Sequence, residues 1–153
     1  MTETVQPQEI LSPESLHAVF VDDEPIIREM TPAMLQGRFD SIEVFETPEE
    51  VIARFRKEDP PNVLITDGNL GEGKMTGLEL ARLTKDEFPT TTTVLISGGI
   101  PDINLDDKEI LDKHGIDFYL PKPARLAQMR ELPNNIRTLR QQQKAGENLP
   151  PVK

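Results

Sequence analysis

The stretch Asn62–Asp67, NVLITD, is a short apolar run that ends in an aspartate. The segments HAVFVD (17–22) and TTVLIS (92–97) contain continuously apolar runs of the same kind. Strands that are buried on both faces of a parallel sheet have this composition. SIEVFE (41–46) alternates apolar and polar residues, as a strand nearer an edge would, and IDFYLP (116–121) is a fifth strand candidate.

Helix signals separate these five runs. Residues 47–50, TPEE, have the pattern of a capping box with proline at the first helical position. Residues 78–83 supply an apolar face, and His114-Gly115 is a plausible glycine stop. Strands that alternate with helices predict an α/β protein with one doubly wound parallel sheet. Pro32 and Pro133 fall inside the first and last helix candidates and are expected to kink or stop them.

Composition excludes several classes of protein. The 153 residues include no cysteine, which excludes a disulfide scaffold, a thiolate zinc site and a cysteine nucleophile. Only two histidines are present, too few for a histidine-rich metal site. The net charge of −10 argues against a nucleic-acid partner and is compatible with a divalent cation. The sequence has no apolar run long enough for a membrane span and no secretory signal, so a cytoplasmic protein is expected.

Both ends of the chain are polar. Residues 1–16 and 141–153 are expected to be flexible extensions, and residues 17–140 to form a single domain.

Polar side chains follow four of the expected strands. Asp22 and Asp23 follow the first, Asp67 ends the third, Ser97 ends the fourth, and Lys122 follows the fifth. In an open parallel sheet, ligands bind at the carboxyl ends of the strands. Three crowded carboxylates require protons or a cation, and their oxygen atoms suit Mg²⁺. A lysine opposite them suits a phosphoryl group, and an aspartate can form an acyl phosphate. The pattern predicts a Mg²⁺-dependent aspartyl-phosphate site.

Each feature alone has a simpler explanation. The acidic pair could cap the first helix, and Asp67-Gly68 could be a turn. Ser97 could begin an ordinary flexible loop, and Lys122 could be a solvated turn lysine. Their convergence on one chemistry favours the site over these alternatives.

With these residues in this order, the chain resembles the receiver domain of response regulators, the phospho-accepting half of two-component signalling. The resemblance extends over about residues 17–140 and rests on the segments VFVDDEP, VLITDGNL, MTGLELAR, VLISGG and DFYLPKP. It implies a five-stranded (βα)5 flavodoxin-like fold with strand order 2-1-3-4-5.

The resemblance also implies a metal site. Mg²⁺ would be held by Asp22, Asp23, Asp67 and the backbone carbonyl of Asn69. Mg²⁺ is therefore the expected cofactor.

The remaining roles follow from the same resemblance. Asp67 would accept the phosphoryl group, Lys122 would pair with its oxygens, and Ser97 would bond to it after transfer. Tyr119 occupies the position of the switch aromatic residue, although plain core packing is the alternative. The Lys122-Pro123 peptide bond is expected to be cis.

Three departures from the family pattern lie near this pocket or near the surface that usually signals. The segments 67–77 and 97–122 are longer than usual, and Gly98 replaces a common alanine. None of the three removes a residue of the phosphorylation site.

The expected function is that of a stand-alone response regulator, and no enzyme activity beyond its own phosphorylation and dephosphorylation is expected. A histidine kinase or phosphotransfer protein would donate the phosphoryl group, and a downstream protein or a second copy of the chain would read the response. One alternative is a pseudo-receiver that acts without phosphorylation. Another is a Mg²⁺-dependent phosphatase of the haloacid-dehalogenase type, which would need an aspartate where Asn69 stands.

Overall fold

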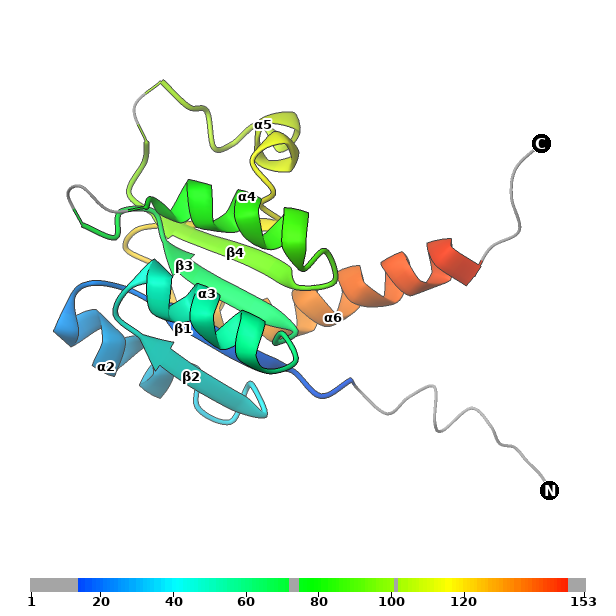
Figure 1. Cartoon of the computed structure of the whole chain (residues 1–153), viewed down its shortest axis with the longest axis horizontal. Coiled ribbons are helices and arrows are strands. Elements are labelled where there is room, and N and C mark those ends of the chain that lie inside the picture. Colours follow the sequence, from blue (N-terminus) through cyan, green and yellow to red (C-terminus); the bar gives the residue numbers. More distant parts are fainter. Residues whose placement is uncertain (1–13, 72–74, 101, 149–153) are drawn as a thin grey trace.

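A computed structural model describes residues 14–71, 75–100 and 102–148. Strands and helices alternate along the chain (Figure 1), with the bounds β1 His17–Val21, α2 Pro25–Met34, β2 Ser41–Phe45, α3 Pro48–Lys57, β3 Val63–Asp67, α4 Gly77–Glu87, β4 Thr92–Ser97, α5 Lys108–Lys113, β5 Phe118–Pro121 and α6 Leu126–Asn148. All five predicted strands are present. The flexibility expected of residues 1–13 and 149–153 falls outside the described residues.

The five strands form one parallel sheet in the order β2-β1-β3-β4-β5. This arrangement confirms the predicted flavodoxin-like fold. Val21 at the end of β1 pairs with Thr66 of β3, and Ser97 at the end of β4 pairs with Pro121 of β5. The strand ends are therefore level, so the residues that follow them meet at one edge of the sheet.

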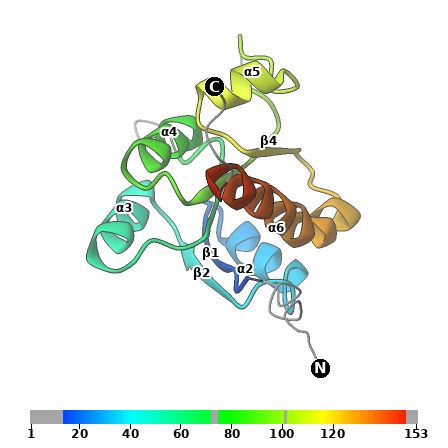
Figure 2. The ribbon, with the colours of Figure 1, turned by 90° about the vertical axis from the view of Figure 1, so that its right-hand side faces the viewer.

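Helices cover both faces of the sheet (Figure 2). On β1, Ala18 and Phe20 belong to the core cluster that includes residues of α6, whereas Val19 and Val21 pack with α3 and α4. This alternation follows from the period of two along a strand. Because both faces are covered, every residue of β3 is buried, as its continuously apolar sequence predicts.

Local signals account for several helix boundaries. The predicted capping box at Thr47 and Glu50 is present at the start of α3. A second capping box, at Thr76 and Glu79, begins α4. Gly115 follows the end of α5 with φ of 74°, a conformation that glycine adopts without steric penalty.

Pro32 and Pro133 were expected to kink or stop their helices, and neither of them stops its helix. Pro32 lies within α2, and α6 continues through Pro133 to Asn148. Leu132 and Ile136 on either side of Pro133 are almost completely buried, so packing offsets the lost backbone hydrogen bond. The helix thus extends beyond residue 140, where the domain was expected to end.

No helix in the described part of the chain has the length and apolar character that a membrane span requires.

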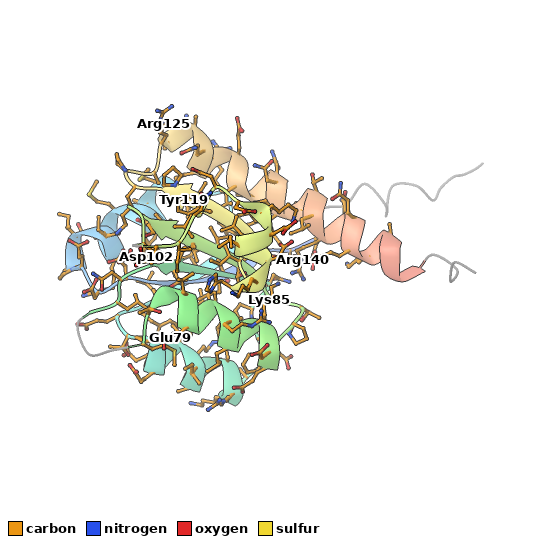
Figure 3. The ribbon with its side chains drawn as sticks, turned by 90° about the horizontal axis from the view of Figure 1, so that it is seen from above. Glu79, Lys85, Asp102, Tyr119, Arg125 and Arg140 are labelled. Atoms are coloured by element: carbon orange, nitrogen blue, oxygen red, sulfur yellow. The ribbon has the colours of Figure 1, made fainter. Side chains whose placement is uncertain are left out.

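The residues just before β1 contact the domain: Leu16 is completely buried, and Glu14 pairs with Arg140 of α6. Arg140 Nε donates to Glu14 Oε1 at 2.9 Å, and Arg140 Nη1 donates to the carbonyl oxygens of Asn62 and Thr90 at 3.1 and 2.7 Å. Arg140 lies on α6 on the side turned toward the sheet (Figure 3). We call this set of contacts the Arg140 network; it closes the amino-terminal edge of the sheet.

Candidate functional site

The predicted site residues meet at the carboxyl-terminal edge of the sheet. Carboxylate oxygens of Asp22, Asp23 and Asp67 all lie within 4.8 Å of one another. Asp22 and Asp67 are buried, with 1% and 4% of their surface exposed, and Asp23 is half-buried. Sequence and structure therefore agree on a cluster of three carboxylates.

Backbone contacts hold the first of these carboxylates in place. Asp22 Oδ1 accepts a hydrogen bond from the backbone N–H of Glu24 at 2.9 Å. The Arg28 guanidinium, one turn into α2, donates to the backbone carbonyl of Asp22 at 2.9 Å. The loop between β1 and α2 is thereby tied to its helix. Arg28 was not identified from the sequence, because its contact depends on how α2 folds back toward the end of β1.

Lys122 supplies the only cation directly paired with this cluster among the described residues. Its Nζ lies 2.9 Å from Asp67 Oδ1 and 3.9 Å from Asp22 Oδ2. The Lys122-Pro123 peptide bond is cis, as expected, and the backbone N–H of Lys122 donates to the carbonyl of Ser97 at 2.9 Å. The cis peptide bond and this hydrogen bond fix the backbone at Lys122, so that its side chain extends past the end of β4 to Asp67 at the end of β3.

Burial and charge shift the ionisation of these groups. Burial raises the pKa of Asp22 from 3.8 to about 6, and the nearby charges of Asp67 and Asp23 add to the rise. The N–H of Glu24 and the charge of Lys122 partly oppose it. For Lys122, burial lowers the pKa, but the hydrogen bond and charge of Asp67, together with the charges of Asp22 and Glu24, raise the pKa overall. Lys122 is therefore a stable cation beside Asp67.

The donor set fits Mg²⁺. Three carboxylates supply hard oxygen ligands within a small volume, and the single ammonium of Lys122 balances only one of their three charges. Asn69 lines the same pocket, together with Asp23, Asp67, Ser97 and Lys122. The side chain of Asn69 accepts from the backbone N–H of Gly71 at 3.2 Å.

The serine and the tyrosine lie where the sequence predicted, and they share one contact. Ser97 is buried, and its Oγ accepts from the backbone N–H of Gly99 at 3.1 Å. The Tyr119 hydroxyl donates to the backbone carbonyl of Ser97 at 3.1 Å. Burial raises the pKa of this phenol, and the charge of Asp106 adds to the rise. Tyr119 thus connects β5 to the end of β4 beside the pocket.

One structural requirement of the site was missed. Gly77, at the start of α4, has its backbone N–H bonded to the carbonyl of Gly68 at 3.1 Å. A Cβ at Gly77 would lie 2.1 Å from the main-chain oxygen of Asp67. Only glycine therefore lets α4 begin so close to the end of β3. The segment MTGLELAR contains this glycine, but spacing along the chain gives no sign of the close approach.

Comparisons with known proteins agree with this geometry. Residues 18–134 match the model of the response regulator receiver domain family. A comparison with curated proteins gives no significant match.

Several solved structures have the same fold. The chemotaxis response regulator CheY4 of Vibrio cholerae is 21% identical, with a TM-score of 0.67 over 80% of this chain and 99% of that one. A CheY-like receiver domain protein from Methanospirillum hungatei is 22% identical, with a TM-score of 0.68 over 87% and 99% of the two chains. NtrX from Brucella abortus is 18% identical, with a TM-score of 0.74 over 92% of this chain but only 31% of its own.

The family match covers the strand ends that carry the three carboxylates, the serine and the lysine. The chain belongs to the response regulator receiver domain family.

Proposed function

We propose that Asp67 accepts a phosphoryl group in a Mg²⁺-dependent reaction and that the chain passes this signal to a partner protein. The observation that supports the proposal best is the position of Asp67, which is buried between the ammonium of Lys122 at 2.9 Å and the carboxylates of Asp22 and Asp23. A receiver domain is a signalling phosphoacceptor, not a true enzyme, and in general its partner is a kinase. For this chain we propose a histidine kinase or a histidine phosphotransfer protein as donor.

The proposed reaction is a single displacement at phosphorus. A carboxylate oxygen of Asp67 attacks the phosphorus atom of a phosphohistidine, the bond from phosphorus to nitrogen breaks, and the ring leaves with the electron pair and takes up a proton from solvent to become neutral imidazole. Lys122 pairs with the phosphoryl oxygens as it now pairs with Asp67. Mg²⁺, when held by Asp22, Asp23 and Asp67, would supply positive charge against the phosphoryl oxygens.

The contacts of Ser97 and Tyr119 suggest how the site could signal. A phosphoryl group carries a charge of about −1.5 to −2 and would attract the Ser97 hydroxyl. The Ser97 hydroxyl now bonds to Gly99, and its backbone carbonyl accepts from Tyr119, so movement of Ser97 disturbs both contacts. We propose that Tyr119 then turns and reshapes the surface formed by α5, β5 and α6. Another protein or a second copy of the chain would read that surface.

Two measurements test this proposal. Incubation with Mg²⁺ and acetyl phosphate should add one labile phosphoryl group in an intact-mass spectrum, and the variant Asp67→Asn should add none. Equal incorporation in that variant would contradict the assignment, and no incorporation in either protein would favour a phosphorylation-independent module. Beryllofluoride should change amide exchange near residues 102–125, and changes confined to the pocket would contradict the switch.

A further inference from the structure

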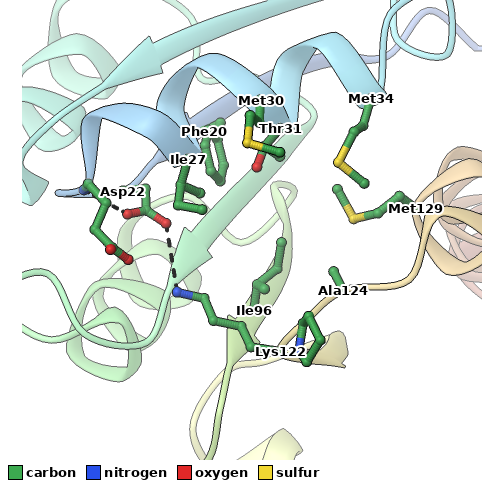
Figure 4. Close-up of a pocket in the computed structure, with 12 residues that line it drawn as sticks. Phe20, Asp22, Ile27, Met30, Thr31, Met34, Ile96, Lys122, Ala124 and Met129 are labelled. Carbon is green, nitrogen blue, oxygen red and sulfur yellow. Dashed lines mark hydrogen bonds and ion pairs between the residues drawn. The ribbon is translucent and has the colours of Figure 1, made fainter.

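A second pocket lies beside the phosphorylation pocket, between α2 and the start of α6 (Figure 4). Its volume is about 430 Å³, within the range of small-molecule sites. Most of its walls are apolar and include Phe20, Ile27 and three methionines, Met30, Met34 and Met129. Methionine side chains are flexible and adapt to ligands of different shape.

This pocket adjoins the site of the proposed phosphorylation, and Asp22 of the carboxylate cluster lies at its edge, but most of its lining is different. Asp67, Asn69 and Ser97 line the phosphorylation pocket but do not line this one. Of the groups described as lining them, only Glu24 and Lys122 border both. Lys122 thus forms a shared wall, because its Nζ pairs with Asp67 in the phosphorylation pocket and reaches Asp22 at the end of the apolar pocket (Figure 4).

One polar atom in the apolar wall, the hydroxyl oxygen of Thr31, has no hydrogen-bond partner among the described residues. Thr31 is 8% exposed, and its hydroxyl oxygen faces the pocket (Figure 4). Within the described part of the chain, this hydroxyl makes no hydrogen bond. A buried hydroxyl without a partner costs free energy, and a bound molecule with a hydrogen-bonding group would remove that cost.

Charge at one end of the pocket selects the chemistry of the ligand. Asp22 and Glu24 supply two carboxylates there. Lys122 supplies one ammonium, which it shares between Asp67 at 2.9 Å and Asp22 at 3.9 Å, so the carboxylates at this end outnumber it. The excess of negative charge at this end of the pocket favours a ligand with a positively charged group that donates hydrogen bonds, and it disfavours a ligand with a carboxylate.

We propose that this pocket binds a small amphipathic amine, whose apolar part lies against the three methionines and whose N–H groups reach Thr31 and the acidic end. Binding needs no phosphorylation of Asp67, so the proposal can be tested apart from the proposed function. Because Lys122 borders both pockets, an occupant would also contact the side chain that pairs with the phosphoacceptor.

Methionine methyl groups provide a direct probe of binding. We would record NMR spectra of the full chain with isotope-labelled methionine methyl groups while adding n-octylamine, n-octanol or n-octanoate at neutral pH. The signals of Met30, Met34 and Met129 should shift and reach saturation with the amine. Met75 packs against the core on the other face of the sheet and should not shift, so it serves as an internal control. Affinity for n-octanoate should be lower than for n-octylamine by about tenfold or more.

Matched variants distinguish binding of the amine in the pocket from nonspecific binding elsewhere on the protein surface. Ala124 lines the pocket, so Ala124→Leu should fill it and abolish the shifts. Ala127, three residues further on, is exposed, and Ala127→Leu should bind normally. Thr31→Val removes the unpaired hydroxyl with little change in shape. This variant should bind n-octylamine about threefold to tenfold more weakly, without loss of stability in the free protein.

Several outcomes would overturn the proposal. Shifts that do not saturate, or that include Met75 equally, indicate adhesion or micelles. Tighter binding of n-octanoate than of n-octylamine would contradict an excess of negative charge at the end of the pocket. Shifts that depend on protein concentration without added amine would assign the pocket to a second copy. If the signals of Met30, Met34 and Met129 shift when a phosphotransfer protein is added but show no saturable shift with n-octylamine, the pocket would belong to a surface that binds a protein partner.

Discussion

Replacing Asp22 with asparagine should stabilise the protein when Mg²⁺ is absent. Asp22 is 1% exposed and shares the pocket with two other carboxylates, and burial followed by those charges raises its pKa to about 6 from 3.8. At 1.36 kcal/mol per pKa unit, ionised Asp22 costs the folded state roughly 3 kcal/mol above pH 6. Asparagine keeps an oxygen for the N–H of Glu24 but loses the attraction of Lys122 at 3.9 Å. We therefore expect a net gain of about 1–2 kcal/mol.

The gain should depend on pH in a defined direction. The pKa of Asp22 is raised in the folded state, so between pH 3.8 and about 6 the folded protein binds more protons than the unfolded chain. The free energy of unfolding of the wild type therefore falls as the pH rises through this window. Asp22→Asn has no such carboxyl group, so its advantage should be small near the lower limit and complete above the upper one.

Urea denaturation followed by circular dichroism measures both effects. The experiment compares wild type, Asp22→Asn and the control Asp23→Asn, whose carboxylate is half-buried, at acidic and slightly alkaline pH. Added Mg²⁺ should stabilise the wild type more than Asp22→Asn, because the variant lacks one ligand charge. Lower stability of Asp22→Asn at alkaline pH without Mg²⁺ would refute the reasoning, since the contacts of the carboxylate would then outweigh the cost of its burial.

Two further substitutions test the supports of the site and of the sheet, both by urea denaturation. Gly77→Ala should destabilise the fold by about 3 kcal/mol, because its Cβ would overlap a main-chain oxygen at the end of β3. Gly98→Ala, with open space around the new Cβ, should change little, and equal losses would contradict the overlap. Arg140→Ala should cost about 2 kcal/mol by breaking a partly buried ion pair, whereas exposed Arg130→Ala on the same helix should cost almost nothing. Arg140 lowers the pKa of Glu14, so this loss should shrink as the pH falls below 4.5, and a loss that does not change with pH would contradict the pairing.

The fold could be predicted in detail because its signals are local. Each continuously apolar run became a strand that is covered on both faces, and the TPEE stretch became the start of α3. The cluster of Asp22, Asp23 and Asp67 followed from strand ends in a parallel sheet, which must meet at one edge. The exact strand order came from the family resemblance, because alternation of strands and helices alone does not determine it.

The features that were missed all depend on contacts between distant parts of the chain. Leu16 and Glu14 belong to a polar stretch that resembles a flexible end, yet the former is buried and the latter pairs with Arg140. The polar sequence after residue 140 lacks an apolar face, but it continues a helix that is already anchored by packing. The need for glycine at position 77 is visible only once α4 lies against the end of β3.

The two edges of the sheet contribute to stability with opposite signs. At the carboxyl-terminal edge, three crowded carboxylates and one lysine leave Asp22 with a raised pKa, which is a cost to the folded state. At the amino-terminal edge, the Arg140 network joins α6, β3, the start of β4 and the chain before β1. A cation or a phosphoryl group at the first edge changes the balance of charge there but touches nothing in the Arg140 network. The response to phosphorylation should therefore be concentrated in the loops at the carboxyl-terminal edge and in the segment 102–125 that carries Tyr119, while amide exchange around the Arg140 network should change little.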